Sequence, residues 1–519
     1  MPRSHEVRHL HLVLADQLDL NSVVFEGFDA ETDAVWMAEV VEGEHHEWCH
    51  KLRVAFSLSA MRHFRSTLEA TGKQVHYTAL SARAEDDRGA CLSEVLRRDV
   101  EQLRPEKLIM VHPGDYRVKE ELVAEAKQLG IELEIREDGH FYDTIAGFGA
   151  WAEGRKVFLL EHYYRHMRKR HEILLESPGE PEGGAWNYDK ENREAFDRKG
   201  PVEIPAVCGF PADAVSEEVV RLVKKRFDRN PGELDDFDLP VNREDALLWL
   251  EDFIANRLPK FGAYQDAMWA EERTLYHSRL SCLLNVKLLG PRECVERAVE
   301  AYRKQKAPLN SVEGFVRQIL GWREFVRGIY WLRMPDYLGM NFLGAKEDLP
   351  SFFWNGNTDM RCVRDAMENV LRHGYAHHIQ RLMVLGLFAQ LFGVHPRRFH
   401  DWHMAMYLDA VDWVSAPNTI GMSQFADGGV VGTKPYCASG NYIHRMSNHC
   451  GSCKFKPGEA TGEQACPFTT FYWDFLGRNH DKLRGNRRMV FQLKNYERKS
   501  SATLEAISRR AEGLRRAWA

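Results

Sequence analysis

This chain is organised around the stretch Asn448-His-Cys-Gly-Ser-Cys-Lys-Phe-Lys456 and its continuation Ala465-Cys466-Pro467. Its three cysteines have the spacing Cys-x2-Cys-x12-Cys-Pro. A short turn brings the first two sulfurs to the same side, so both can bind one metal centre, and a Pro directly after a ligating Cys is common in iron–sulfur proteins. The alternative is that all three are ordinary buried thiols, because free Cys is among the most buried residue types. The spacing favours a metal centre.

Three sulfurs complete neither a tetrahedral zinc site nor a four-iron cluster, so a fourth ligand must come from elsewhere in the chain. His444 and His449 lie close by in sequence, and Cys362 and Cys437 are the other candidate thiolates. Spacing alone does not distinguish zinc from iron–sulfur. The sequence therefore predicts a metal centre whose type stays open at this point.

The composition indicates a large globular protein without membrane spans. The chain has 519 residues, more than one hydrophobic core usually serves, which predicts two or three domains. No run of 18 apolar residues is present, and the N-terminal residues Met1–His9 lack an apolar signal core. Ten Cys in so long a chain suit a reducing compartment better than a disulfide framework. We expect a cytoplasmic monomer.

Basic residues are concentrated at the C-terminal end. From Asn479 onward, eleven Lys and Arg stand against four Asp and Glu, although the whole chain has a formal net charge of -6. A basic tail on an acidic body suits an anionic partner such as DNA. The alternative is a solvated amphipathic helix that only covers the fold.

The first part of the chain, residues 1–140, alternates between short apolar strands and helices. Strands are expected at Leu10–Leu14, Ala34–Ala38, Val75–Ala79, Lys107–Val111 and Ile131–Ile135, with helices between them at Val54–Ala70, Leu92–Leu103 and Glu120–Leu129. This alternation predicts an α/β domain in which helices cover both faces of a parallel sheet.

Ligands of such sheets lie beyond the carboxyl ends of the strands. At those ends this chain has Asp16, Glu39 and the acidic and His-rich run Glu42–Glu47. Neither Gly-x-Gly-x-x-Gly nor a phosphate-binding loop is present, so the usual nucleotide signatures are missing. The alternative is that these residues are solvated loop residues.

Two further regions follow. Residues 141–235 are rich in Gly and Pro and predict a long connector. Its basic segment Tyr163–His171 could contact a phosphate backbone or lie in solvent. From Asn242, a good helix N-cap, apolar residues recur at helical spacing, which predicts an all-helical domain over residues 236–519.

Three groups of polar and aromatic residues lie within this helical part. Tyr276–Ser281 carries hydroxyl groups and an Arg at an expected helix start, which suits a pyrophosphate. Glu313–Phe325 is an apolar helix with two Arg, two Glu and a Trp, and Tyr407–Asn418 contains three further Asp and Asn side chains. Each group alone is more often helix surface or a satisfied core residue. Their order along the chain is the informative feature.

The order of these groups resembles the flavin domain of cryptochromes and photolyases. The resemblance is carried by Tyr-His-Ser-x-Leu-Ser from Tyr276, Glu-Gly-Phe-x-Arg-Gln-x-x-Gly-Trp-Arg-Glu-Phe from Glu313, Ala-His-His-Ile-Gln-Arg-Leu-Met from Ala376, and the segment Asp409–Asn418. It extends over essentially the whole chain, from Ala15-Asp-Gln-Leu to Tyr472-Trp-Asp-Phe-Leu, and includes Gly421-Met-Ser-Gln-Phe-Ala-Asp-Gly-Gly. The cysteine pattern, with Cys362 included, is similar to that of the iron–sulfur bacterial branch, whose members are prokaryotic (6-4) photolyases.

The resemblance implies a fold and three cofactors. The fold is a Rossmann-like antenna domain, a linker and a helical domain that binds a U-shaped FAD. A [4Fe–4S] cluster would be bound by Cys362, Cys450, Cys453 and Cys466. A 6,7-dimethyl-8-ribityllumazine antenna would lie near Asp16 and Glu44, where Gly43 occupies the position of one family carboxylate. The implied FAD-binding residues are Tyr276, His277, Ser278, Leu280, Ser281, Glu313, Arg317, Trp322, Arg323, Asp409 and Asn418.

The implied activity is light-driven repair of (6-4) pyrimidine–pyrimidone photoproducts in UV-damaged DNA. The lesion would be flipped out of the duplex, and the light-excited reduced flavin would give it one electron. His378 would be the proton donor, with His377 as the second candidate, because imidazole titrates near neutral pH. Electron-transfer roles are implied for Trp402 and Trp354, with Tyr442 as a possible relay, and His403 stands where the family often has Tyr.

Two other functions would use the same features. A blue-light photoreceptor of the cryptochrome type needs the same flavin pocket. A non-catalytic iron–sulfur DNA-binding protein, like the cysteine-rich domain of large primase subunits, needs only the cluster and the basic tail. The His pair and the basic tail together favour repair.

Overall fold

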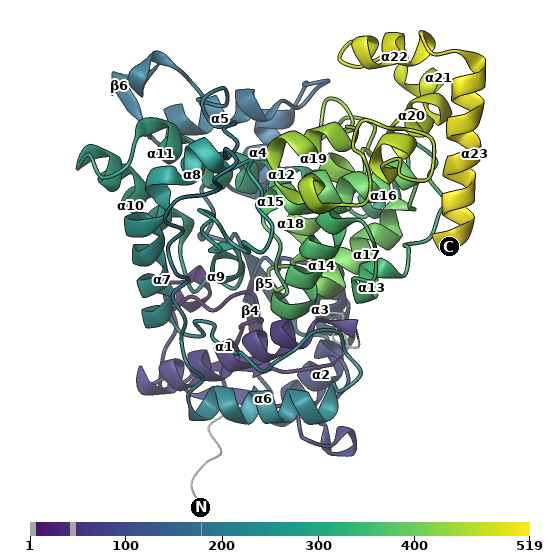
Figure 1. The fold of residues 1–519 in the computed structure, drawn as a ribbon. Helices are drawn as coiled ribbons and strands as arrows, with labels where there is room; N and C mark the ends of the chain where they lie inside the picture. The colour runs from purple at the N-terminus through teal and green to yellow at the C-terminus, as the bar shows by residue number, and fades with distance from the viewer. Residues whose placement is uncertain (1–6, 42–47, 178, 519) are drawn as a thin grey trace, which may run out of the picture.

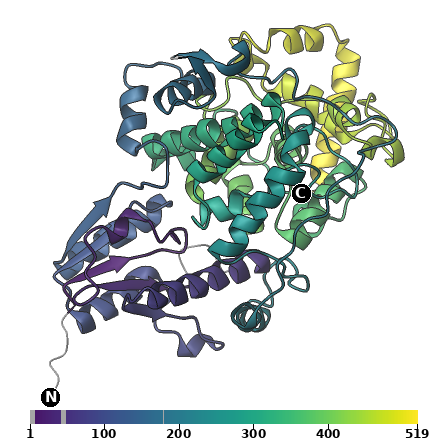
Figure 2. The ribbon, with the colours of Figure 1, turned by 90° about the vertical axis from the view of Figure 1, so that its left-hand side faces the viewer.

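The structure is a computed structural model that describes residues 7–41, 48–177 and 179–518. It consists of an α/β part and a larger helical part that lie against each other (Figures 1 and 2). None of the described helices is both long and apolar enough to cross a membrane. The Glu44 position lies outside the described residues.

The α/β part is built on a five-stranded parallel sheet in the order β3-β2-β1-β4-β5. The strands are β1 (His9–Leu12), β2 (Ala34–Ala38), β3 (Val75–Thr78), β4 (Lys107–Val111) and β5 (Glu132–Arg136). In the register, Leu10 lies beside Ala34 and Leu108. All five expected strands and their parallel arrangement are confirmed.

Helices cover both faces of this sheet because side chains alternate along each strand. Leu10, Leu12, Ala34 and Trp36 point into a core shared with α2 (Leu92–Leu103) and α3 (Tyr116–Leu129). Val35 and Met37 point to the opposite side, into a core that contains α1 (Lys51–Ala70). The expected helices are confirmed, although α1 and α3 begin a few residues earlier than the apolar pattern indicated.

The Gly- and Pro-rich connector is more structured than its composition indicates. It contains α4 (Ile145–Ala152), α5 (Leu160–Arg170), the short antiparallel pair β6 (Leu175–Ser177) and β7 (Glu180–Pro181), and α6 (Ala214–Arg226), which packs on α1. The basic segment on α5 does not present one free charged face. Its Arg168 is fully buried and donates hydrogen bonds to the carbonyl oxygens of Ile173, Leu174 and Trp186.

From Asn242 onward the described chain is helical, apart from loops and isolated bridges. Asn242 is confirmed as an N-cap, because its side chain accepts a hydrogen bond from the Asp245 amide. The elements are α7 (Arg243–Asn256), α8 (Leu258–Tyr264), α9 (Ser281–Asn285), α10 (Pro291–Arg303), α11 (Leu309–Val316), η5 (Arg317–Arg323), α12 (Glu324–Arg333), η6 (Asp336–Gly339), α13 (Phe352–Asn355), α14 (Arg361–His373), α15 (His378–Gln380), η7 (Arg381–Gly386), α16 (Leu387–Phe392), α17 (Pro396–Met406), α18 (Asp412–Ala416), η8 (Pro417–Ser423), α19 (Gly440–Met446), η9 (His449–Ser452), α20 (Pro467–Arg478), α21 (His480–Leu483), α22 (Val490–Glu497) and α23 (Ser501–Trp518).

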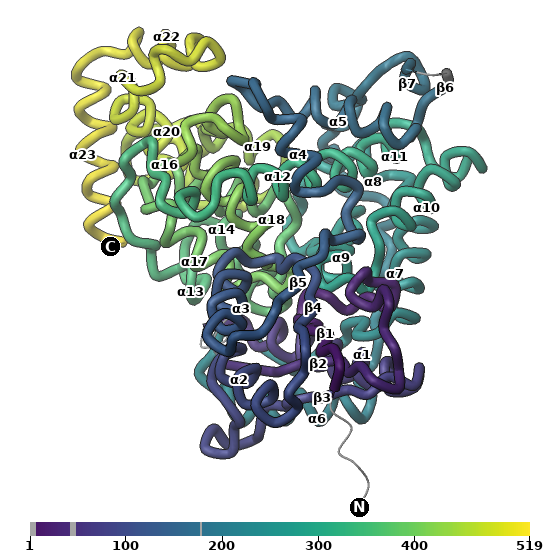
Figure 3. Tube along the Cα trace, turned by 180° about the vertical axis from the view of Figure 1, so that it is seen from behind, coloured from purple at the N-terminus to yellow at the C-terminus, as the bar shows by residue number. Residues whose placement is uncertain are grey.

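The C-terminal helices form the outer margin of the helical part (Figures 1 and 3). The helix α23 packs along α20, and its Trp518 ring lies against Phe352 and Phe471. Arg510 donates to the Ala465 carbonyl, and Arg515 donates to the Phe392 carbonyl. Arg510 and Arg515 of the basic C-terminal end therefore stabilise the packing of α23 against the rest of the fold.

Candidate functional site

A cavity of about 1270 Å³ lies within the helical part and is open to the surface. Its volume exceeds the 300–1,000 Å³ that is usual for small-molecule sites. The residues that the sequence marked as site residues and that line it are His277, Ser278, Leu280, Ser281, Arg317, Trp322, Arg323, His378, Asp409, Asn418 and Tyr442. They come from segments more than 160 residues apart along the chain, which the fold brings to one wall.

Three π-helical turns contribute to this wall. The segments η5, η7 and η8 each interrupt a longer helix, and Arg317, Arg381 and Asn418 of these segments line the cavity. Wider turns of this kind occur frequently at functional sites because they displace side chains from the regular helical position. Here they turn polar side chains of largely buried helices toward the cavity.

An ion pair crosses the cavity wall between Arg381 and Asp409. The Arg381 Nη1 lies 2.9 Å from Asp409 Oδ1, and the Ser281 hydroxyl donates to Asp409 Oδ2 over 2.5 Å. Burial alone would raise the pKa of Asp409, but Arg381 and Ser281 lower it below its ordinary value. A fixed carboxylate beside a fixed guanidinium therefore faces the cavity near neutral pH.

Several buried polar atoms of the lining have no hydrogen-bond partner among the described residues. They are His277 Nε2, Arg279 Nη1, Arg317 Nε, Arg323 Nε, His403 Nδ1 and the Tyr407 hydroxyl. A buried polar atom without a partner is costly, so native proteins rarely leave several of them in one wall. A ligand rich in phosphate, hydroxyl and ring acceptor groups would satisfy this wall, and a flavin dinucleotide has these groups.

The histidines beside the cavity are neutral near pH 7. His378 is exposed to the open cavity, and desolvation by the surrounding protein atoms together with Arg381 lowers the pKa of His378 to about 4. Burial, and then His378, lower the pKa of His277 to about 3. The rings of His277 and His377 stack with their centroids 4.6 Å apart, and His377 itself does not line the cavity. Of the two adjacent histidines, His378 is therefore the one that a ligand in the cavity can reach.

Four other predicted residues do not line the cavity. Tyr276 donates its hydroxyl hydrogen to the Val202 carbonyl, and Glu313 is fully buried, where it accepts the Tyr188 amide. Trp402 is buried and donates its indole N–H to the Phe353 carbonyl over 2.8 Å, whereas Trp354 is 41% exposed. Neither Tyr276 nor Glu313 lines the cavity, and their polar atoms bond within the protein, so their roles in FAD binding stay predictions.

Aromatic rings connect the cavity to the surface on the α17 side. Tyr407 lines the cavity, and its ring lies 4.4 Å from His403 and 5.7 Å from Trp402. Trp402 in turn lies 5.1 Å from Phe353, the neighbour of the exposed Trp354. Tyr442 stands elsewhere on the cavity wall, so it does not belong to this row of rings.

The four candidate cysteines come together at a small second cavity. Cys362, Cys450, Cys453 and Cys466 line a space of about 20 Å³. Burial raises the pKa of Cys362, and the sulfurs of Cys466, Cys450 and Cys453 raise it further, which reflects how close the four thiols are. His449 also lines this space, but its Nε2 faces Asp365 at 3.0 Å. Cys437 lines the large cavity instead.

At the carboxyl edge of the sheet, Asp16 faces the helical part. Its Oδ2 accepts the Gly114 amide over 3.1 Å, and a cavity of about 70 Å³ lies beside it, bordered by Asp115 and Asp412. Glu39, the other predicted residue of this edge, is buried in hydrogen bonds with Arg62, Tyr77 and the Leu80 amide. Glu39 therefore has a structural role.

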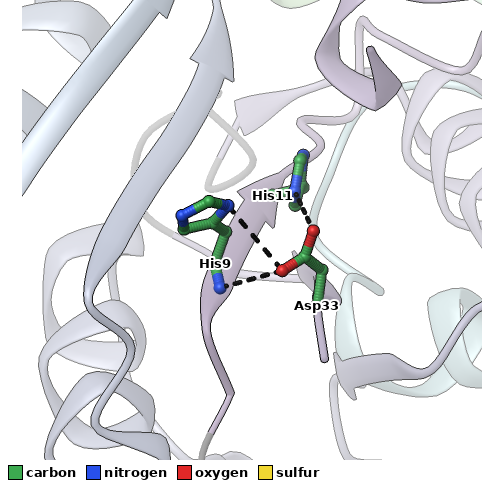
Figure 4. Close-up of side chains that lie close together, drawn as sticks. All are labelled: His9, His11 and Asp33. Carbon is green, nitrogen blue, oxygen red and sulfur yellow. Dashed lines mark hydrogen bonds and ion pairs between the residues drawn. The ribbon is translucent and has the colours of Figure 1, made fainter. Parts of the chain in front are cut away.

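A different cluster, not indicated by the sequence reasoning, lies at the start of β1 (Figure 4). His9 Nδ1 and His11 Nε2 lie 3.7 and 3.6 Å from the Asp33 carboxylate, and the three donor atoms are within 4.8 Å of one another. Each Asp33 oxygen already accepts an N–H from the Arg8 side chain and another from the backbone of His9 or Asp29. Because these bonds occupy the carboxylate lone pairs, we assign the cluster a structural role.

The sequence reasoning missed several lining residues. Arg279 and Arg381 lay inside the quoted patterns, where they could have been identified as buried cations. Phe158–His162, Asp189 and Arg193 of the connector also line the cavity, and Arg317 pairs with Asp189. Nothing local in the connector sequence indicates this contact, because it depends on how the connector folds back over α11 and η5.

Comparisons with known proteins agree with this geometry. The family model for deoxyribodipyrimidine photo-lyase-related proteins matches residues 11–239. The chain is 42% identical over 491 residues to a (6-4) photolyase of Agrobacterium fabrum, covering 95% of this chain and 96% of the relative. Its fold is similar to a class III photolyase of Agrobacterium tumefaciens, with a TM-score of 0.56 at 14% identity over 98% of both chains. It is also similar to a Synechocystis cryptochrome, with a TM-score of 0.53 at 14% identity over 85% of this chain and 89% of the other.

Proposed function

The chain belongs to the photolyase and cryptochrome family, in the branch of the bacterial (6-4) photolyases, and we propose that it repairs (6-4) photoproducts in DNA with light. The observation that carries this proposal is the large cavity whose wall has cationic and unpartnered polar atoms at the positions of the family pattern. Its volume leaves room for a flavin and for an extruded pair of bases.

Proteins of this family generally bind FAD, and the residues around the cavity fit it. Ser278 and Arg279 offer hydroxyl and guanidinium donors for the pyrophosphate, and Arg381 with Asp409, which Ser281 also holds, offers a donor and an acceptor for the flavin ring. When bound and reduced, FAD supplies an electron to the lesion on absorbing light. The residues of the chain hold that ring, exclude water and supply the proton to the lesion.

His378 is proposed as the residue that gives the lesion its proton. In the free protein its pKa of about 4 leaves the imidazole neutral at pH 7. A DNA phosphate or an anionic lesion beside the ring would offset Arg381 and raise that pKa, since a nearby opposite charge favours the charged form. His378 would therefore acquire its proton when the substrate enters, and His377, which stacks on His277 behind the wall, stays the second candidate.

A [4Fe–4S] cluster bound by the four cysteines is also proposed. Zn–S bonds of about 2.3 Å would place the sulfurs of a tetrahedral zinc site about 4 Å apart. Among the described residues, the three-donor group within 4.8 Å is His9, His11 and Asp33, so the four sulfurs are spread more widely than one zinc ion requires. A wider cage of four thiolates suits a four-iron cluster.

A lumazine antenna at Asp16 is the remaining cofactor proposal. The described residues alone do not fit it, because the cavity there is about 70 Å³, below the usual 300–1,000 Å³. Chromatography of the chromophores released from purified protein will decide the proposal, because a bound lumazine is released together with the flavin.

The test is repair of a synthetic oligonucleotide with one (6-4) photoproduct under blue light. The wild-type protein is expected to restore the two pyrimidines in light and not in darkness. The His378→Ala variant is expected to lose repair while it retains flavin photoreduction. Photoreduction without any wild-type repair would favour a photoreceptor, and an absorption spectrum without flavin would favour a non-catalytic iron–sulfur DNA-binding protein.

A further inference from the structure

The helix α22 begins at the edge of the large cavity. In the turn before it, Asn486 Nδ2 donates to the Thr433 carbonyl over 3.0 Å, and Thr433 lines the cavity. Arg488, in the same turn, also lines it. From there α22 runs along the outer end of the helical part, over α20 (Figures 1 and 3). Its exposed surface is therefore continuous with the rim of the site.

The two sides of α22 differ in character. Met489 and Leu493 are buried and attach the helix to the fold. Phe491, on the other side, is 73% exposed, the largest exposed fraction of any large hydrophobic residue that the structure describes. Among the described residues Phe491 has no ring–ring or cation–π partner, and its neighbour Val490 is also 41% exposed, so α22 presents apolar side chains to solvent.

Basic residues flank Phe491 along the chain. Arg487 and Arg488 lie in the turn directly before α22, and Lys494 lies within the helix, three residues after Phe491 and thus near it on the helix surface. All three are exposed, and none has an ion-pair partner in the described part of the chain. An aromatic ring among unpaired cations fits a polyanion with stacked bases better than it fits a protein surface, because phosphates match the cations and a base matches the ring.

We propose that α22 binds the duplex beside the lesion, with these cations on backbone phosphates and Phe491 inserted as a wedge into the base stack. This inference rests on the proposed function. Extruding a base leaves a gap in the stack and costs a few kcal/mol. Proteins that deform DNA commonly insert Phe, Leu, Ile or Met at such a step. A wedge on the cavity rim fills the gap that the lesion leaves when it enters the cavity.

The experiment measures binding of the flavin-loaded protein, in the dark, to a duplex with one (6-4) photoproduct and to the same duplex without it. Phe491→Ala is expected to weaken binding of the damaged duplex about 5- to 100-fold, the range that stacking on one aromatic ring supplies. Binding of the undamaged duplex changes less, because its stack has no gap. Phe491→Trp retains the preference for damage.

The cations are tested separately by the Arg487→Gln, Lys494→Gln double variant. This double variant is expected to weaken binding of both duplexes by the same factor. It should also reduce the magnitude of the slope of log affinity against log salt concentration by about 2, since each lost phosphate contact reduces that slope by about 0.9. Phe491→Ala leaves that slope unchanged. The different salt responses separate stacking from charge.

Leu248→Ala is the matched control, because Leu248 is 59% exposed on α7, remote from α22 (Figure 1). It is expected to bind both duplexes like the wild type. Suppose that the wild type repairs the lesion, but Phe491→Ala binds damaged DNA as tightly as Leu248→Ala does. The proposal that Phe491 inserts into the base stack is then wrong, while the proposed function stands. If the wild type neither repairs nor prefers damaged DNA, the proposed function fails and takes this inference with it.

Discussion

At the scale of single residues, the site depends on charges that burial makes expensive to leave unpaired. Arg381 faces Asp409 and also lies over the Tyr407 ring at 4.0 Å, so one guanidinium touches both polar and aromatic parts of the wall. The same cation lowers the pKa of His378. The protonation of His378 therefore depends on desolvation first, on Arg381 second, and on the charge of any ligand that enters the cavity.

The first prediction concerns the proton on His378. Its pKa is expected to be about 4 in the DNA-free protein and to rise on binding of damaged DNA, because the added negative charge favours the imidazolium. Repair should accordingly fall as the pH rises through the pKa of the complex. The measurement is an NMR titration of labelled histidine with and without the damaged duplex, using His378→Asn to assign the signal. A pKa that stays near 4 in the complex would contradict donation from an imidazolium.

The second prediction concerns the Asp409 carboxylate. Asp409→Asn leaves Arg381 buried without its counter-charge, which is expected to cost about 3 kcal/mol of stability and to reduce flavin retention. Chemical denaturation and the flavin-to-protein ratio measure the two effects. The control is Asp401→Asn, which breaks the exposed Arg397–Asp401 pair of 2.7 Å and should change stability by less than about 1 kcal/mol. Equal losses of stability in the two variants would show that the Arg381–Asp409 pair contributes no more than an exposed ion pair does.

At the scale of elements, the cysteine site joins separate segments. Cys362 lies in the first turn of α14, Cys450 and Cys453 lie in and directly after η9, and Cys466 is the N-cap residue of α20. A group bound by all four would hold α14 against the start of α20. The local chain between these elements has little regular structure of its own, so it depends on that connection.

The third prediction is that Cys450→Ala strongly lowers the yield of folded protein and removes bound iron, because metal binding contributes directly to folding free energy. Iron content and melting temperature are the measurements. Cys294→Ala is the control, since Cys294 is fully buried in α10 outside the group and should retain iron. Normal iron content and an unchanged melting temperature in Cys450→Ala would rule out the ligand role.

The fourth prediction concerns the row of rings on α17. Trp402→Phe is expected to reduce flavin photoreduction to a small fraction of the wild-type rate, because Trp402 lies between the cavity ring Tyr407 and the surface side of α13. Loss of its indole hydrogen bond costs about 1 kcal/mol, so the protein stays folded. Trp151→Phe, at another buried Trp that does not line the cavity, should photoreduce normally. Similar rates in both variants would place the electron path elsewhere.

At the scale of the whole molecule, hydrogen bonds fix the sheet part against the helical part. The Tyr116 amide donates to the Tyr330 hydroxyl over 2.9 Å, and that hydroxyl donates to Asp412 over 2.6 Å. Asp412 also faces His400 at 3.1 Å. This row of contacts runs from the start of α3 to α17 and thus connects the carboxyl edge of the sheet with the cavity wall.

The fifth prediction is that Tyr330→Phe destabilises the protein by about 1–3 kcal/mol, because it leaves the Tyr116 amide and the Asp412 carboxylate each without one buried partner. Hydrogen exchange at the Tyr116 amide should become faster. Tyr77→Phe is the control, because its hydroxyl bonds Glu39 within the sheet part alone. It should cost a similar amount of stability but leave exchange at Tyr116 unchanged, and faster exchange in both variants would contradict a specific connection.

Much of the fold could be predicted from the sequence because its signals are local. Strand and helix periods depend on residues two to four positions apart, and the N-cap at Asn242 depends on one side chain and the amide three residues later. These predictions are confirmed for all five strands and for the main helices. In the connector, the sequence predicts only the basic helix-like segment Tyr163–His171, which lies largely within α5, because frequent Gly and Pro hide α4 and α6, whose positions depend on packing against distant helices.

In the candidate site too, some features are encoded in the sequence and others depend on the fold. The sequence by itself determined the family, the residues of the flavin and cysteine patterns, and the basic C-terminal end, since these are matters of residue type and order. Only the tertiary structure decided which of those side chains reach the cavity, that Tyr276, Glu313 and His377 do not line it, and that Arg488, in the turn before α22, does. Side-chain direction and burial depend on contacts between segments hundreds of residues apart, which no local pattern encodes.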